Sequence, residues 1–288
     1  MVRWRKLCLL FFLVLLGACS GTTFVYNRLD FILPWYVDDY AQLNTQQDVY
    51  LDELLAPFLA WHRNQELPGY IKIIDGIEGR LDQSLTPADV ADTFSEFEAA
   101  WLRLEGEALD WLLELGTQLS DEQIEGFLRV LWEQQEEYNE EFLERTDEEF
   151  YEDSYDHLVD NTKEYLGTLS SGQREQLREF SRRLLRSDQV WLQERAEWLT
   201  QLAVLLERRP GWQQRVKEAV VARRENLPPE YVRIYQHNMG VIFDAIAPLL
   251  NGRSERQDRH LREKLSDLRE DFAALVAQGR SQDGSSSG

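Results

Sequence analysis

Cysteine is almost absent from this chain of 288 residues, which contains only Cys8 and Cys19. Everything after residue 19 therefore lacks the thiols that a disulfide, a Cys-x-x-Cys redox pair or a thiolate metal site requires. Histidine is also scarce, at four residues, and none of the four has a glutamate three positions before it. The Glu-x-x-His pattern of di-iron helix bundles is thus missing, which excludes a centre of that kind.

Two histidines have an acidic residue at a spacing of four, which would place both side chains on one face of an α-helix. The pairs are His62 with Glu66 and Asp153 with His157. An isolated pair at this spacing is typical of a surface contact, so we predict that both are exposed. The chain also lacks a glycine-rich phosphate loop, a Gly-x-Ser-x-Gly elbow and a His-Glu-x-x-His zinc motif. We therefore predict no catalytic residue, no cofactor and no metal site, and a protein that is not an enzyme.

Long apolar runs are missing as well. The run from Leu7 to Leu16 has ten residues, too few to cross a bilayer, and no run of eighteen follows Cys19. The short run is preceded by basic residues and followed by small ones. A charged start, an apolar centre and a small-residue end are typical of a secretory signal peptide.

Leu16-Gly17-Ala18-Cys19 resembles the lipobox at which bacterial lipoproteins are cleaved and their cysteine is lipidated. The resemblance implies that residues 1–18 are removed as a signal peptide and that Cys19 carries acyl chains that hold the protein on a membrane. In the same sorting rule, aspartate after the cysteine retains a lipoprotein in the inner membrane, and Ser20 stands here instead. We therefore expect a lipoprotein on the periplasmic face of the outer membrane. The alternative is an uncleaved anchor helix that happens to end in cysteine.

Positive charge is in short supply. The formal net charge is −21, and removal of residues 1–18, with three basic and no acidic residues, lowers it to −24. A chain this anionic repels the phosphate backbone, so we expect no nucleic-acid partner.

What the chain does contain is helical periodicity. Apolar residues recur at spacings of three and four, and no alternating run of useful length predicts a strand. A Ser, Thr or Asn followed three residues later by Gln or Asp is a capping box, the start signal of a helix. It occurs at Asn44, Thr86, Ser120, Ser170 and Ser254. We predict an all-α bundle of long antiparallel helices without a sheet.

Domain bounds follow from these patterns. Residues 44–278 are expected to form the helical domain, either as one body or as two packed halves, and 279–288 a disordered Ser/Gly tail. Within the domain we expect one helix from Ile124 to Leu158, another from Gln173 to Glu207, and a break before a helix that begins at Pro68.

Residues 19–43 are expected to form a lipidated tether followed by an aromatic segment that is broken at Pro34. Two interpretations stay open. The segment folds onto the core, or it presents a surface to the membrane or to a partner, with Trp35 and the tyrosines at the interface. The candidate interaction residues are Trp35, Asp38, Asp39 and Tyr40.

Charge is distributed unevenly along the rest of the chain. Residues 121–156 hold fifteen acidic and two basic residues, whereas 174–224 hold twelve basic and seven acidic ones. The acidic run is a solvated face, or it pairs with the basic segment, or it binds cationic periplasmic proteins. The candidate residues for that binding are Glu136, Glu137, Glu140 and Glu141.

Two resemblances follow from these motifs. Cys19 together with Tyr26-Asn27-x-Leu29-Asp30, Pro34-Trp35, Asp38-Asp39-Tyr40, Leu43-Asn44 and Leu67-Pro68 resembles an uncharacterised family of Gram-negative lipoproteins, which implies no activity. The Leu-Ser-x-x-Gln starts at Leu119 and Leu169 are similar to the LTxxQ motif of the Spy and CpxP periplasmic chaperones, which implies a helical binding protein. We expect a non-enzymatic lipoprotein that binds protein or envelope components. The alternatives are a structural spacer in envelope assembly and a hydrolase with an acidic site.

Overall fold

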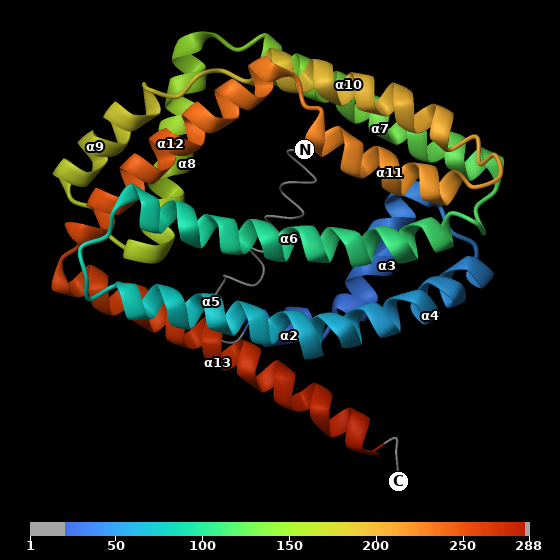
Figure 1. The fold of residues 1–288 in the computed structure, drawn as a ribbon, viewed down its shortest axis with the longest axis horizontal. Helices are drawn as coiled ribbons and strands as arrows, with labels where there is room; N and C mark the ends of the chain where they lie inside the picture. Colours follow the sequence, from blue (N-terminus) through green and yellow to red (C-terminus); the bar gives the residue numbers. More distant parts are fainter. Residues whose placement is uncertain (1–20, 286–288) are drawn as a thin grey trace. The chain divides into compact units, whose positions relative to one another are not determined.

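A computed structural model describes residues 21–285, and it describes side chains from residue 22 to residue 280. The lipobox and Cys19 lie outside the described residues. Within them the regular secondary structure is entirely helical and no strand is present, so the all-α class is confirmed (Figure 1). The described residues divide into two compact units. The first comprises residues up to Leu85, Ala91–Gln118 and those from Arg253 onward, and the second comprises Thr86–Val90 and Leu119–Gly252.

The helices of the first unit begin close to the predicted lipid anchor. They are α2 (Gly21–Tyr26), α3 (Leu29–Ala41), α4 (Thr45–Trp61), the π-helical turn η1 (His62–Glu66), α5 (Leu67–Arg80), most of α6 (Pro87–Leu115) and α13 (Glu255–Ser285). The second unit contains α7 (Asp121–Leu143), α8 (Asp147–Leu166), α9 (Ser171–Ser181), α10 (Asp188–Leu205), α11 (Trp212–Glu225) and α12 (Pro229–Asn251).

Capping boxes start the helices as the sequence predicts. At Ser120, for example, the hydroxyl accepts from the backbone N–H of Gln123, whose side chain accepts from the N–H of Ser120. The same reciprocal pattern occurs at Asn44, Thr86, Ser170 and Ser254. Each box satisfies backbone donors that the first turn of a helix leaves without partners.

Several predicted helix limits are wrong, each for a local reason. The helix expected from Ile124 to Leu158 is two helices, because Thr146 and Glu149 form a sixth capping box and start α8. The helix expected from Gln173 to Glu207 is interrupted at residues 182–187. At the other end of the chain, α13 runs to Ser285 rather than ending at 278.

Proline breaks the chain less than expected. α3 continues through Pro34, because Leu33 and Val37 on its inner face pack against the core that Leu51 and Leu55 form on α4. This burial offsets the one hydrogen bond that proline removes. No break precedes Pro68 either, because α4 passes through η1 directly into α5. A π-turn is wider than an α-turn, and such bulges accommodate local irregularity within a helix.

α13 lies antiparallel to α5 along one side of the first unit (Figure 1). Arg262 pairs with Asp82 near the start of α13, and Arg269, about two turns further along α13, pairs with Asp75. Towards its end, α13 meets η1, where a Cβ on Gly279 would lie 2.6 Å from Asn64 Oδ1. Glycine at this position therefore leaves room for the side chains of Asn64 and Arg63.

Candidate functional site

The four candidate residues on α3 separate into two groups. Trp35 is 64% exposed, and Asp38 and Asp39 are exposed on the same side of the helix. Tyr40 turns away, because its hydroxyl accepts a hydrogen bond from Tyr36 at 2.9 Å and both rings are half-buried. Asp38 also stabilises the end of α3, because its Oδ1 accepts a hydrogen bond of 2.7 Å from the backbone N–H of Leu43 just beyond the helix. Of the four candidates, Trp35 and the two aspartates thus lie on the outward face of α3.

A buried polar cluster fastens α2 to the π-turn. The ring of His62 has no exposed surface; its Nδ1 lies 2.8 Å from the hydroxyl of Tyr26 and its Nε2 3.3 Å from that of Tyr70. Burial, and to a smaller extent the nearby charge of Arg63, lowers the pKa of His62 from 6.5 to about 3. Burial also raises the pKa of Tyr26 to about 12. At neutral pH the cluster is therefore an uncharged imidazole between two phenols.

The prediction that His62 and Glu66 form an exposed contact is wrong. Glu66 is only 5% exposed, and its carboxylate accepts two hydrogen bonds of 2.9 Å from Arg103 rather than contacting His62. Each side chain is held by other partners, since His62 lies between Tyr26 and Tyr70 while Glu66 pairs with Arg103. Asp153 and His157 are both exposed, and Asp153 pairs with Arg145. No group of three potential metal ligands occurs among the described residues.

The glutamates of α7 form a continuous exposed surface in the second unit, which we name the acidic face. Its spacings of three and four place all members on one side of the helix, over about 16 Å. None of these side chains forms a hydrogen bond or ion pair with the described residues. The acidic face consists of Glu133, Glu136, Glu137, Glu140, Glu141 and Glu144.

The opposite side of α7 packs against α10. Gln135, which is 2% exposed, accepts a hydrogen bond of 2.6 Å from Arg195, whose guanidinium also lies 5.1 Å from the ring centre of Tyr138. Arg208, just beyond α10, pairs with Asp121 at the start of α7, so the two helices are antiparallel. The acidic run and the basic segment therefore do pack together, but through α7's inner side and ends rather than through the acidic face.

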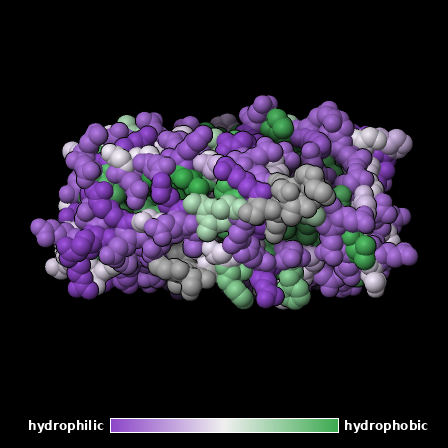
Figure 2. Space-filling model, turned by 90° about the horizontal axis from the view of Figure 1, so that it is seen from below, coloured by the Kyte–Doolittle hydropathy of each residue, from purple (hydrophilic) through white to green (hydrophobic). Residues whose placement is uncertain are grey.

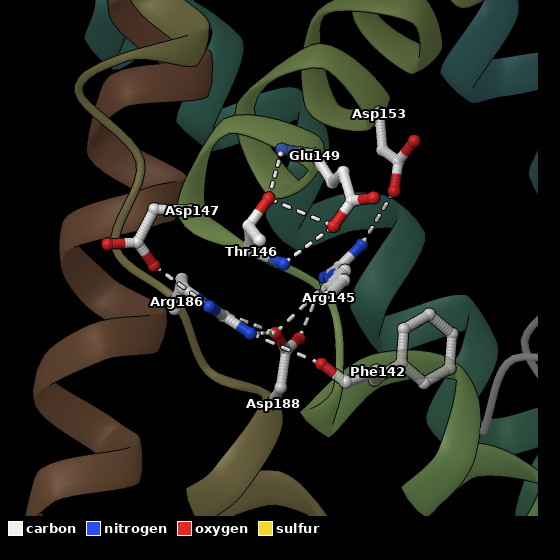
Figure 3. Close-up of polar contacts among 8 residues, drawn as sticks. All are labelled: Phe142, Arg145, Thr146, Asp147, Glu149, Asp153, Arg186 and Asp188. Carbon is white, nitrogen blue, oxygen red and sulfur yellow. Dashed lines mark hydrogen bonds and ion pairs between the residues drawn. The ribbon is translucent and has the colours of Figure 1, made fainter.

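Figure 3 shows the ion-pair network that holds the turn between α7 and α8. Asp188, at the start of α10, accepts from Arg145 at 2.9 Å and from Arg186 at 3.1 Å. Arg186 also pairs with Asp147 at 2.8 Å and donates a hydrogen bond to the carbonyl of Phe142 at 3.2 Å. This network fixes the end of the acidic face, and the sequence motifs did not indicate it.

Two exposed aromatic residues, Phe24 and Phe31, were not among the candidates predicted from the sequence. Among the described residues, nine large hydrophobic side chains are exposed, and three of them lie close together in sequence on α2 and α3. Phe24 and Phe31 join Trp35 in this group, at 62% and 73% exposure. The spacings of seven residues from Phe24 to Phe31 and four from Phe31 to Trp35 could have indicated a shared helix face. Elsewhere, the face in Figure 2 is mostly hydrophilic, with apolar residues in small separate groups.

No described helix is long and apolar enough to be a candidate membrane span. No curated protein and no solved structure matches the chain. One family model does match, over residues 39–233, and its description reads family of unknown function (DUF6279). The matched region includes Asp39, Tyr40 and the whole acidic face, and it covers more than half of the chain. The protein therefore belongs to the DUF6279 family of unknown function.

Proposed function

We propose that this protein is a non-enzymatic lipoprotein of the periplasmic face of the outer membrane, and that it binds cationic protein partners through the acidic face of α7. The observation that carries the proposal is that six glutamates share one exposed side of α7 and pair with no described residue. Neighbouring like charges repel, so the acidic face costs folding stability unless a cation approaches from outside. A partner with clustered lysine or arginine residues supplies that cation.

The carboxyl groups with a shifted pKa among the described residues do not supply the acid that the hydrolase alternative needs. Hydrogen bonds from backbone N–H groups at helix starts lower the pKa of Glu122 and of Glu149. Burial raises the pKa of Asp258, but hydrogen bonds from Arg253 and Arg262 outweigh it and the net shift is again downward. The general acid of a glycoside hydrolase needs a shift in the other direction.

The test is charge reversal of Glu136, Glu137, Glu140 and Glu141 to lysine. We expect the melting temperature to stay nearly unchanged, because these side chains pair with no described residue and four lysines repel one another much as four glutamates do. Binding of a fluorescent lysine-rich peptide should be abolished. Binding to the unaltered protein should weaken steeply as salt rises, since screening shortens the range of surface charges.

A matched control reverses four exposed acidic residues of the first unit and so changes the net charge equally. We use Asp52, Asp92, Glu98 and Glu107 for this purpose. Retention of peptide binding by the control and its loss in the α7 variant would support a specific surface. Equal loss in both variants would show that only net charge matters, and unchanged binding in the α7 variant would leave the acidic face as a solvated surface. Either of these two results contradicts the proposal.

A further inference from the structure

The fold leaves three large aromatic side chains of α2 and α3 exposed. Phe24, Phe31 and Trp35 are 62%, 73% and 64% exposed. Phe31 and Trp35 lie one turn apart on the outer side of α3, whereas Leu33 and Val37 on its inner side pack against α4. We name Phe24, Phe31 and Trp35 the aromatic ridge. Three large exposed aromatic residues between residues 24 and 35 indicate an interaction surface.

The two helices that carry the ridge are firmly held. Besides the buried hydrogen bond between Tyr26 and His62, Thr23 donates to Asp271 on α13 at 2.9 Å. Asn27, between the two helices, accepts from Arg63 and donates to Gln278 at 3.1 and 3.2 Å. The ridge is therefore a fixed feature of the first unit.

Covalent geometry limits how far the ridge can be from the lipid of Cys19. Two peptide units separate Cys19 from Gly21, the first residue of α2, and they span at most about 7 Å. Phe24 follows within the same short helix. We propose that the aromatic ridge rests on the phospholipid leaflet that holds the acyl chains. This inference depends on the lipidation of Cys19 in the proposed function.

The side chains of the ridge suit the headgroup region of a bilayer. Aromatic rings, tryptophan above all, concentrate at membrane interfaces. Arg28 lies between the members of the ridge, with its guanidinium carbon 5.3 Å from the ring centre of Phe24, and it supplies a cation for lipid phosphate. The exposed carboxylates of Asp30, Asp38 and Asp39 oppose deep burial, so contact is shallow.

The test uses a single reporter thiol. Once residues 1–18 are removed and Cys19 is lipidated, the chain has no free thiol, so Phe31→Cys provides a unique attachment point for an environment-sensitive fluorophore. The full lipoprotein is reconstituted in phosphatidylethanolamine–phosphatidylglycerol vesicles, with or without brominated lipid. Val204→Cys on α10 is the matched control, because Val204 is 61% exposed. Circular dichroism checks that both variants are folded.

We expect brominated lipid to remove most of the fluorescence of the label at residue 31 and to leave that at residue 204 unchanged. Replacing Phe24 and Trp35 by serine should restore the signal at residue 31, since the ridge then loses its apolar contacts. Equal response of the two labels to brominated lipid overturns the proposal. So does a label at residue 31 that is shielded from iodide but not quenched by lipid, because a protein or a second copy then covers the ridge.

Failure of the lipid anchor is a separate result. Mass spectrometry of the N-terminal peptide reports directly whether Cys19 carries lipid. If it does not, the proposed anchorage fails, and the label is moved to a chain with Cys8→Ser and Cys19→Ser that is mixed with the same vesicles. Quenching at residue 31 in that chain supports the aromatic ridge, and its absence overturns it.

Discussion

The buried imidazole of His62 links the pH dependence of stability to one residue. Its pKa is about 3 in the folded chain and 6.5 in the unfolded one. Below pH 6.5 the unfolded chain therefore binds a proton that the folded chain excludes. The stability is fully present above pH 6.5 and declines as the pH falls towards 3, by up to about 1.4 kcal/mol per unit. Urea unfolding between pH 7.5 and 5 measures this slope.

His62→Gln removes the titrating group and should flatten the slope, whereas His157→Gln, at an exposed position, should leave it in place. A proton resonance of the His62 ring that titrates near pH 6.5 in the folded protein would refute this account.

The hydroxyl of Ser120 is a second single-residue contribution, because it caps α7 through Gln123. We expect Ser120→Ala to lower the free energy of unfolding by about 0.5–2 kcal/mol. Ser154→Ala, inside α8, is the control, and it should be neutral or slightly stabilising because alanine favours helix. Equal effects of the two substitutions in denaturant unfolding would argue against capping as the cause.

Among the helices, the junction of α7, α8 and α10 depends on Asp188. Its side chain is 10% exposed and lies between two guanidinium groups. Asp188→Asn leaves both cations without their shared carboxylate, so we expect a loss of about 3 kcal/mol in denaturant unfolding.

Asp153→Asn is the matched control, because Asp153 also pairs with Arg145 but is 55% exposed. An exposed pair contributes about 0–1 kcal/mol. A smaller loss at Asp188 than at Asp153 would show that burial is not what makes the network matter.

Helix starts show where sequence patterns suffice to predict the structure. A capping box acts over three residues, so the starts at Asn44, Ser120 and Ser170 are readable from the chain. The helix ends expected near Thr146, Pro34 and Pro68 could not be predicted from one local signal. The apolar spacing continues past Thr146, so it predicted one long helix although a capping box is present. At Pro34, packing against α4 outweighs the local cost of proline.

For the molecule as a whole, the proposed membrane attachment depends on one atom, the sulfur of Cys19. We expect Cys19→Ala to yield an unlipidated precursor that is not cleaved, because the substitution removes the acceptor of the lipid. Metabolic labelling with palmitate and the mobility of the protein in gels measure both effects. Because Ser20 follows the cysteine, fractionation should place the unaltered protein in the outer membrane. Lipid labelling of the variant at the level of the original protein, or recovery in the inner membrane, would contradict the prediction.

The sequence by itself determined the all-α class and most helix starts, because helical periodicity and capping are short-range properties. It also located the candidate residues on α7, since spacings of three and four define one face of a helix. Three features follow from packing between distant segments: the side of α7 that faces α10, the burial of His62 and Glu66, and the exposure of Phe24 and Phe31 together with Trp35. Burial and pairing depend on segments far apart in the chain, as with Thr23 and Asp271 or Tyr26 and His62, and no local pattern contains both partners.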